Sequence, residues 1–409
     1  MIKKLFKFKK LLTINYLPLF TFLFWRLLLS FASWLGQRFI PLKEGFLGGE
    51  GFGVWANFDG VHYLSIAQRG YIDFEQTFFP LYPLLIRFLA PLFRGNFLFS
   101  ALFISHICLL TTLLLFSKLL QLDFKDKLSI IHHPEPEQSS VQGSTKPSSA
   151  LVYGHPLIIL LLFPTSFFFA SVYSESLFLM LVLGAFLAAK KKGWGLAGIL
   201  GALASATRLV GVFLLPALLV EFWQQKTLRN WKLAFRRNPA KRAIGNLIYL
   251  LFIPLSLFAY MFYLRKAFGD PLRFLHAQQA VGYRETARII LLPQVFWRYL
   301  KIFLTVSPHT FAFWVAVLEF GTTVLFLILT VFSFLKLSLS YSIFMLLSIL
   351  TPTLTGTLNS MPRYVLTCFP GFILLGLINN RVMRVFLLSA FWFLLIILTA
   401  FFTRGYFIS

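Results

Sequence analysis

Two carboxylates stand where they could act on a substrate. Asp59 lies in WANFDGVHYLSIAQRGY (residues 55–71), three residues before His62, and Glu175 begins an apolar run in SVYSESLF. A carboxylate beside a hydroxyl group can take its proton as a general base. An ionisable group at membrane depth is costly, so we expect Glu175 to contact a substrate or to pair with a cation. For Asp59 the alternative is a helix cap, and His62 could position a substrate or hydrogen-bond Asp59.

Two arginines have the chemistry to hold a phosphate. Arg208 lies between the apolar runs GLAGILGALASAT and LVGVFLLPALLV, and Arg363 follows a proline in NSMPRY. Guanidinium groups bind phosphate through charge-assisted hydrogen bonds and can stabilise negative charge that develops on it. Two structural alternatives stay open. Arg208 could instead form an ion pair with Glu175, and Arg363 could extend to the membrane surface.

A third acidic residue, Asp270, lies in FGDPLRFLHAQQ. Its simplest role is to cap a helix whose first turn starts at Pro271. Asp59, Glu175 and Asp270 could also converge on a divalent cation, but no ligand spacing demands a metal. We therefore predict neither a metal nor another cofactor.

The composition is that of a polytopic membrane protein. The 409 residues are 58% hydrophobic and only 13% charged, with a mean hydropathy of +0.77, whereas soluble domains have about 25% charged residues. The net charge of +24 fits cytoplasmic loops and anionic lipid surfaces. No compact basic soluble domain is present to bind nucleic acid. Cys108 and Cys368 lie in apolar runs and predict neither a disulfide nor a metal site.

A helix needs about 20 apolar residues to cross a membrane. On this basis we predict a single all-α domain over residues 1–409 with about eleven crossings, at 16–40, 97–120, 151–170, 175–189, 193–207, 209–223, 246–264, 311–335, 339–359, 364–379 and 385–403. Residues 193–223 could be one long helix instead of a hairpin.

The distribution of Lys and Arg predicts the sidedness, because basic loops stay in the cytoplasm. The N-terminal lysines are then cytoplasmic, as is a flexible loop at 121–150 that is rich in Pro, Ser and Gln. The most basic connections fall on this side only if 193–223 crosses twice, which favours the hairpin. They are 190–192, KTLRNWKLAFRRNPAKR (226–242), Lys336 and 381–384.

The outer face then collects the unusual polar residues. It holds two long loops, 41–96 and 265–308, together with SVYSES, Arg208 at the hairpin tip and NSMPRY. In the first loop, a short helix should begin at Asp59 as its cap and end at Gly70. Residues 78–93 predict a second helix that is interfacial or partly inserted in the membrane. This gathering on one face indicates a site at the membrane surface.

Several motifs together resemble the PIG-V family, which includes the second mannosyltransferase of glycosylphosphatidylinositol assembly. They occur in the family's order between residues 55 and 370: WANFDGVHYLSIAQRGY, FFPLYPLLIR, YSESLFLMLVLGAFLAA, GLAGILGALASATRLVGVFLLP, FGDPLRFLHAQ and PRYVLTCFP. The family usually has Trp directly before Asp-Gly, and Phe58 stands there in this chain. A Phe ring can stack on a sugar, but it lacks the N–H of Trp.

The resemblance implies a GT-C fold, a multi-helix membrane bundle whose first outer loop carries a catalytic acid. It implies mannosyl transfer with inversion from a polyprenyl-phosphate donor to a lipid, glycan or protein acceptor, among membrane lipids. Because inversion needs only one carboxylate, Asp59 is the expected base. The expected substrate-binding residues are His62, Tyr173, Glu175, Arg208, Asp270, His276, Gln278 and Arg363.

The expected location is the plasma membrane, with a cytoplasmic N-terminus and the active site on the outer face. The absence of a Gly-rich phosphate loop argues against a soluble nucleotide sugar as donor. The alternative function is a flippase or transporter of a lipid-linked sugar. Such a protein should carry polar residues along a path through the membrane, whereas the middles of the predicted crossings are almost purely apolar.

Overall fold

The computed structural model describes residues 17–43, 45, 51–131, 149–225, 245, 247–282, 284–285 and 288–408. Within these residues the secondary structure is helical, and no strand is formed. In this described part of the chain, five helical segments are long and apolar enough to cross a membrane. They are α2 (Leu17–Phe39), Phe97–Asp123 of α5 (Phe97–Ile131), the segment Leu247–Phe268 that ends with α12 (Phe252–Phe268), α16 (Phe311–Lys336) and α20 (Arg381–Thr403). The predicted all-α membrane protein is confirmed, while the eleven crossings stay a prediction.

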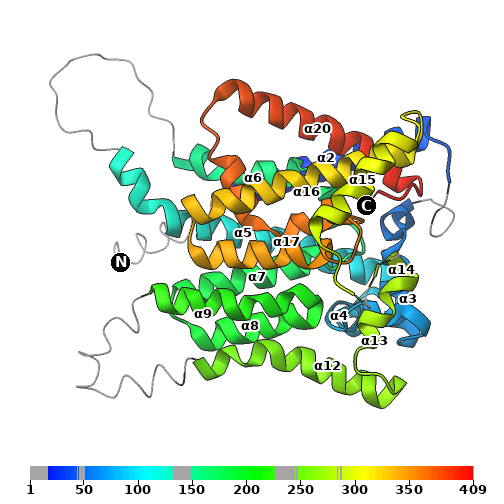
Figure 1. The fold of residues 1–409 in the computed structure, drawn as a ribbon, viewed down its shortest axis with the longest axis horizontal. Helices are drawn as coiled ribbons and strands as arrows, with labels where there is room; N and C mark the ends of the chain where they lie inside the picture. Colours follow the sequence, from blue (N-terminus) through cyan, green and yellow to red (C-terminus); the bar gives the residue numbers. More distant parts are fainter. Residues whose placement is uncertain are drawn as a thin grey trace, which may run out of the picture.

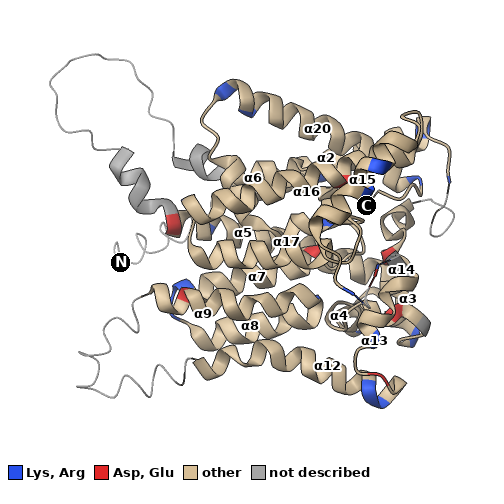
Figure 2. Cartoon of the chain, in the orientation of Figure 1, with Lys and Arg blue, Asp and Glu red and all other residues tan. Residues whose placement is uncertain are grey.

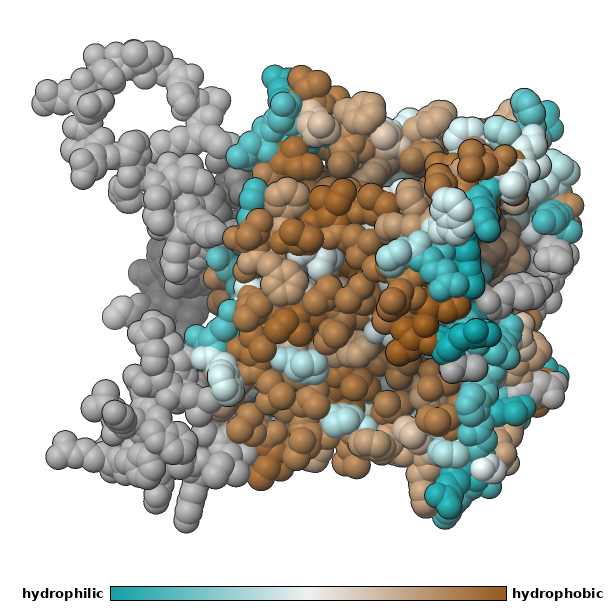
Figure 3. All heavy atoms as spheres, viewed as in Figure 1, coloured by the Kyte–Doolittle hydropathy of each residue, from teal (hydrophilic) through white to brown (hydrophobic). Residues whose placement is uncertain are grey.

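On the face drawn in Figure 3, apolar side chains cover the middle of the bundle, with polar residues toward its two ends. Exposed side chains such as Phe258, Leu335 and Phe393 contribute to this surface. In water such a surface would be strongly unfavourable, so it indicates contact with lipid. Lys, Arg, Asp and Glu likewise gather toward the two ends of the helices (Figure 2).

The helix α7 (Glu175–Lys190) lies in the centre of the bundle, beside α5 and α8 (Figure 1). All of its residues except Met180 and Lys190 are buried. A helix that is apolar on every side can be buried by protein as well as by lipid. The 16 residues of α7 thus form the core, against which shorter helices pack. These are α9 (Leu214–Gln224), α17 (Leu339–Thr353) and α19 (Phe369–Gly376), whereas α6 (Ser149–Leu162) packs on α2, α5, α19 and α20.

The predicted hairpin at 193–223 is confirmed as a reversal of the chain. The helix α8 (Trp194–Thr207) ends at Arg208, whose backbone is extended, and the chain returns through η6 (Leu209–Phe213) and α9. Gln225 Nε2 donates to the carbonyl of Ala189 at 2.9 Å, so α9 ends beside the C-terminus of α7. Each arm is short of the length needed for a full crossing.

Small residues allow α8 to pack closely on α12 and the turn before it. A Cβ at Gly198 would lie 2.1 Å from the carbonyl oxygen of Tyr249, and one at Gly201 would lie 2.7 Å from Ile253 Cγ1. The small-residue run in the sequence therefore acts as a helix-packing surface.

Residues 41–96 contain α3 (Asp59–Arg69) and α4 (Leu81–Leu89), with short 3-10 helices η2 (Gly51–Ala56), η3 (Asp73–Thr77) and η4 (Ala90–Phe93). The predicted helix is confirmed, and it ends at Gly70, which has φ +88°. The predicted cap is wrong. Phe58 occupies the N-cap position, no side chain caps α3, and the Asp59 carboxylate instead contacts Arg363.

Residues 265–308 contain α13 (Arg273–His276), α14 (Gln278–Gly282) and α15 (Leu292–Thr305). The short helix α18 (Met361–Tyr364) follows α17 and leads through η8 (Val365–Thr367) into α19. The predicted flexible loop at 121–150 is partly wrong, because α5 continues to Ile131. Residues 132–148 lie outside the described residues, as do residues 1–16 and the basic run 226–242.

Candidate active site

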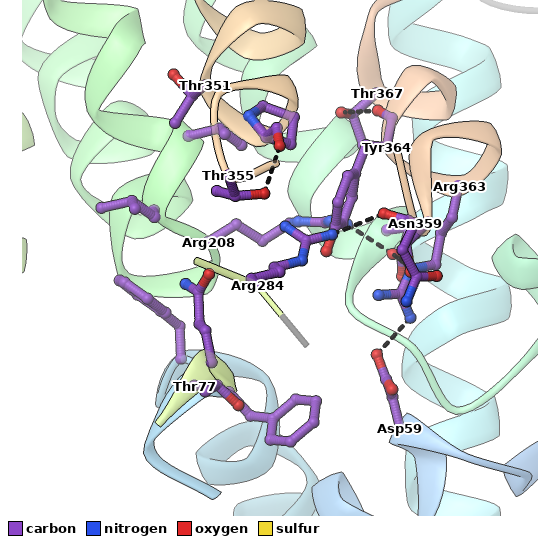
Figure 4. Close-up of a pocket in the computed structure, with 18 of the residues that line it drawn as sticks. Asp59, Thr77, Arg208, Arg284, Thr351, Thr355, Asn359, Arg363, Tyr364 and Thr367 are labelled. Carbon is purple, nitrogen blue, oxygen red and sulfur yellow. Dashed lines mark hydrogen bonds and ion pairs between the residues drawn. The ribbon is translucent and has the colours of Figure 1, made fainter. Parts of the chain in front are cut away.

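A cavity of about 230 Å³ opens at the end of the bundle that carries Asp59 and the N-terminus of α7. We call this the cavity end. Segments far apart in the sequence meet there, from α3, α7, the α8–η6 turn, the 265–308 segment and residues 348–367 (Figure 4). The lining residues are Asp59, Tyr63, Thr77, Phe78, Phe79, Glu175, Thr207, Arg208, Leu209, Val210, Leu275, Gln278, Arg284, Ser348, Thr351, Pro352, Thr355, Asn359, Ser360, Arg363, Tyr364, Thr367 and Phe407.

A strained turn places Asp59 at the cavity. Phe58 has φ 58° and ψ −118°, and Gly60 N donates to the carbonyl of Asn57 at 3.2 Å. These are the features of a type II′ turn, in which glycine normally occupies the position of Phe58. A non-glycine residue in such a conformation costs about 1–3 kcal/mol and persists only where surrounding contacts hold it. One such contact is Tyr173, whose hydroxyl donates to the Asn57 carbonyl at 3.0 Å.

Asp59 is the first member of a chain of alternating charges. Its Oδ2 forms an ion pair with Arg363 Nη1, and Arg363 Nε lies 3.5 Å from Glu175 Oε1. The same Glu175 oxygen accepts a hydrogen bond from Arg208 Nη1 at 2.6 Å. Because Glu175 and Arg363 are buried, these pairs fix α3, α7, α8 and α18 relative to one another. The structural alternative for Arg208 is therefore present, and a phosphate role for it stays a prediction.

The second oxygen of Asp59 is available for chemistry. Among the described residues, Oδ1 has no hydrogen-bond partner, and the side chain is 17% exposed. Arg363 thus orients the carboxylate through Oδ2, while Oδ1 can accept a proton from a bound hydroxyl group. This is the arrangement that a general base needs.

Three guanidinium groups surround the Tyr364 ring. Arg208, Arg284 and Arg363 lie 5.1, 4.9 and 5.3 Å from its centroid, within the range of cation–π attraction. Arg284 differs from the other two, because within the described part of the chain it forms no ion pair with a carboxylate. Its Nη2 donates to the carbonyl of Asn359 at 2.7 Å. Arg284 is thus the cation most available to an anionic ligand.

His62 does not contact Asp59, contrary to one expectation. Its Nδ1 lies 3.5 Å from Glu75 Oε1, and its ring stacks on Phe78 at 5.2 Å. Glu75 also accepts a hydrogen bond from the backbone N–H of Ile72. His62 therefore supports Phe78, which lines the cavity, from behind.

Three further residues that we expected to bind substrate, Tyr173, Asp270 and His276, also lie outside the cavity lining. Tyr173 is buried, with Arg363 5.3 Å from its ring. Asp270 and His276 pair with each other at 2.7 Å, with 57% of the His276 side chain exposed. The hydrogen bond from His276 lowers the pKa of the Asp270 carboxyl. Gln278, in contrast, lines the cavity as expected.

The convergence of three carboxylates is not found. Asp270 is engaged with His276, and Arg363 lies between Asp59 and Glu175. Across the described ranges, no group of three His, Cys, Asp or Glu residues is placed to hold a metal ion.

A buried carboxylate that the sequence analysis did not single out holds one wall of the cavity. Glu319 in α16 accepts a 2.5 Å hydrogen bond from the Tyr299 hydroxyl, which in turn accepts from the backbone N–H of Leu358 at 3.2 Å. Arg298 donates to the carbonyl of Gly356 at 2.8 Å. Together with the Arg284 bond, these contacts position residues 356–360. A lone Glu within an apolar helix was the sequence signal that could have identified Glu319.

A scan against models of known protein families finds no match to this chain, and a search of curated proteins finds none. The resemblance to the PIG-V family therefore rests on the quoted motifs.

Proposed function

We propose that this chain is a membrane glycosyltransferase of GT-C type. It would move a sugar, mannose if the resemblance holds, from a polyprenyl-phosphate donor to a hydroxyl group of a lipid, glycan or protein acceptor. One observation supports this above others. A carboxylate, one oxygen of which has no partner among the described residues, shares a cavity with three arginines at the end of an apolar bundle.

In the proposed reaction, Asp59 is the general base. Its Oδ1 takes the proton of the acceptor hydroxyl as that oxygen attacks the anomeric carbon of the donor sugar. The bond between this carbon and the phosphate oxygen breaks, and its electron pair leaves with the phosphate. Because attack and departure occur on opposite faces of the sugar, the configuration inverts and a single carboxylate suffices.

The arginines would stabilise the departing phosphate. Arg284 would make the first contact, since no carboxylate of the described residues forms an ion pair with it. Arg208 would add a second charge through its other guanidinium nitrogens, while its Nη1 stays with Glu175. Charge-assisted bonds of this kind strengthen as negative charge develops, so they lower the barrier. Arg363 then acts chiefly by orienting Asp59, which revises the expectation that it holds phosphate.

The remaining lining suits a lipid carrier. Leu209, Val210 and Pro352 line the cavity beside the cations, so an apolar chain attached to the phosphate would meet apolar side chains. We infer that the cavity end faces the outside of the plasma membrane, because 190–192 and 381–384 lie toward the opposite end and basic segments stay in the cytoplasm.

Asp59→Asn tests the base. The purified protein in lipid nanodiscs is given a radiolabelled polyprenyl-phosphate mannose and a membrane extract as the source of acceptor, and the product is identified by mass spectrometry. We expect turnover to fall about 10²- to 10⁴-fold, the usual contribution of a general base. Undiminished turnover by folded Asp59→Asn protein would exclude Asp59 as the base.

Asp123→Asn is the matched control. Asp123 lies at the opposite end of the bundle, pairs with Lys190 at 2.8 Å, and has the same exposed fraction as Asp59, 17%. Like Asp59→Asn, the Asp123→Asn substitution removes a paired carboxylate of equal exposure. Because Asp123 lies away from the cavity, turnover should stay at the wild-type level. Vesicles reconstituted with the wild-type protein test the alternative: movement of labelled lipid across the bilayer without sugar transfer would favour a flippase.

A further inference from the structure

Phe407 presents an aromatic ring to the cavity that contains Asp59. It lies after α20, lines the cavity, and is 39% exposed. Its ring meets that of Phe58 in a T-shaped contact at 5.2 Å. Such a contact covers at most one face of the Phe407 ring. With 39% of Phe407 exposed, part of its ring is left uncovered in the cavity that Asp59 also lines.

Phe58 itself does not line the cavity. Its ring packs against Phe402 at 6.1 Å and against Phe407. The residue that stands in place of the family Trp thus supports the open ring from behind, and Phe407 is the aromatic residue that a ligand can reach.

The segment that carries Phe407 is held on both sides. Ile408 is buried, and the Tyr406 ring packs on Phe311 at 5.4 Å. Arg404 Nε donates to the carbonyl of Ile40 at 2.9 Å, and the N–H of Lys43 donates to the carbonyl of Arg404 at 3.0 Å. A ring fixed in this way loses little conformational freedom when a ligand covers it.

The chemistry of this wall matches a pyranose ring. One face of a pyranose carries C–H groups that pack on an aromatic ring, while hydroxyl groups around its edge need hydrogen-bond partners. Phe407 supplies the aromatic surface, and Thr77 and Gln278 line the same cavity with polar groups. A serine or threonine side chain of a polypeptide has no such face to cover the ring.

The position relative to Asp59 indicates which sugar binds there. In an inverting transfer the base lies on the acceptor side of the anomeric carbon and the phosphate lies on the other side. Phe407 packs on Phe58, the residue before the base, whereas Arg208 and Arg284, the proposed phosphate ligands, lie beside the Tyr364 ring. The Phe407 side of the cavity is therefore the acceptor side.

We propose that Phe407 is the platform for the acceptor sugar, so that the acceptor is a glycan or glycolipid and not a polypeptide. This inference rests on the proposed function. It adds the class of acceptor and a residue that selects it.

The test compares Phe407→Ala, Phe407→Leu and Phe407→Trp in nanodiscs. Binding of methyl α-mannoside and methyl β-glucoside is measured by saturation-transfer NMR without donor, and binding of the labelled polyprenyl-phosphate mannose is measured separately. We expect the Ala and Leu variants to weaken glycoside binding about three- to tenfold, as for loss of an aromatic contact. The Trp variant should retain it. Donor affinity should stay within about twofold of wild type.

Each other outcome has a defined meaning. Equal binding by the Leu and Trp variants would show that apolar bulk suffices, which would overturn the platform. Loss of donor affinity in place of glycoside affinity would assign Phe407 to the donor sugar. Transfer by the wild type to a Ser/Thr peptide but to no glycoside would overturn the acceptor class and leave the proposed function standing. Glycoside binding that depends on Phe407, without any sugar transfer, would support the platform and overturn the proposed function.

Discussion

The two roles of Arg208, ion-pair partner and phosphate ligand, can be separated by a double-mutant cycle with Glu175. The variants are Arg208→Met, Glu175→Gln and the double mutant. The pair is short at 2.6 Å, and the side chains are 13% and 2% exposed, so water screens it little. Removing Arg208 leaves the Glu175 carboxylate buried, and Arg363, at 3.5 Å, is then its one cationic partner among the described residues.

The magnitudes for stability follow from this burial. Breaking a buried ion pair from one side costs about 3–5 kcal/mol. The double mutant removes both charges, so its loss should be smaller than the sum of the single losses by about 0.5–3 kcal/mol. Thermal unfolding in nanodiscs should therefore show the double mutant more stable than the sum of the single effects predicts.

Donor affinity should behave differently. Loss of a charge-assisted hydrogen bond to phosphate costs about 1.5–3 kcal/mol, which is about a ten- to hundredfold rise in the donor Kd. If Arg208 binds phosphate, the double mutant regains stability but not donor affinity. Return of the donor Kd to within about threefold of wild type would refute the phosphate role. Arg284→Met is the companion variant: it loses the hydrogen bond to the Asn359 carbonyl but breaks no ion pair among the described residues, so it should weaken donor binding with a smaller loss of stability than Arg208→Met.

Three further changes test features of the fold. Phe58→Gly should destabilise the protein by about 1 kcal/mol less than Phe58→Ala, because glycine adopts the positive φ without strain; equal thermal midpoints would argue against strain there. Gly198→Ala should lower the free energy of unfolding by about 1–3 kcal/mol, since its Cβ would lie 2.1 Å from the Tyr249 carbonyl oxygen. Gly195→Ala should be tolerated, since its Cβ would lie 3.9 Å from the nearest atoms, in the Tyr249 ring. The hydrogen bond from His276 lowers the Asp270 pKa, so this pair stabilises residues 270–276 at pH values above the ordinary Asp pKa. The stabilisation is lost as pH falls through the lowered pKa, and hydrogen exchange of 270–276 should then rise beyond its intrinsic pH dependence. Asp270→Asn should remove this rise, and an unchanged pH profile in the variant would contradict the pairing.

Local patterns predicted the local structure around the site. The helix at 59–69, its end at Gly70 and the reversal at Arg208 all depend on neighbouring residues, so they could be identified without the fold. The number of crossings could not be. The buried helix α7 and the lipid-exposed helix α12 are both apolar on every side, and hydropathy alone does not distinguish protein from lipid as the surrounding medium.

The partners of charged residues depended on distant parts of the chain. Asp at the start of a helix predicts a cap, but Asp59 instead pairs with Arg363, which is 304 positions away. His62, which we expected near Asp59, instead has its Nδ1 3.5 Å from Glu75 Oε1. Arg284 belongs to none of the motifs, and Phe407 is one of 51 phenylalanines. Neither residue type nor spacing could therefore distinguish these two residues from their surroundings.

The conformation of Phe58 connects the base with the proposed acceptor platform. If the turn served only to place Asp59, glycine at this position would provide the same backbone without the strain that a side chain adds. A large ring is favoured there only if its contacts repay that cost, and those contacts are with Phe402 and Phe407. On the proposed function, the same residue thus sets the direction of the base and supports the ring on which the acceptor would lie. A substitution at 58 should then change acceptor affinity together with turnover, whereas one at Phe407 should change acceptor affinity first.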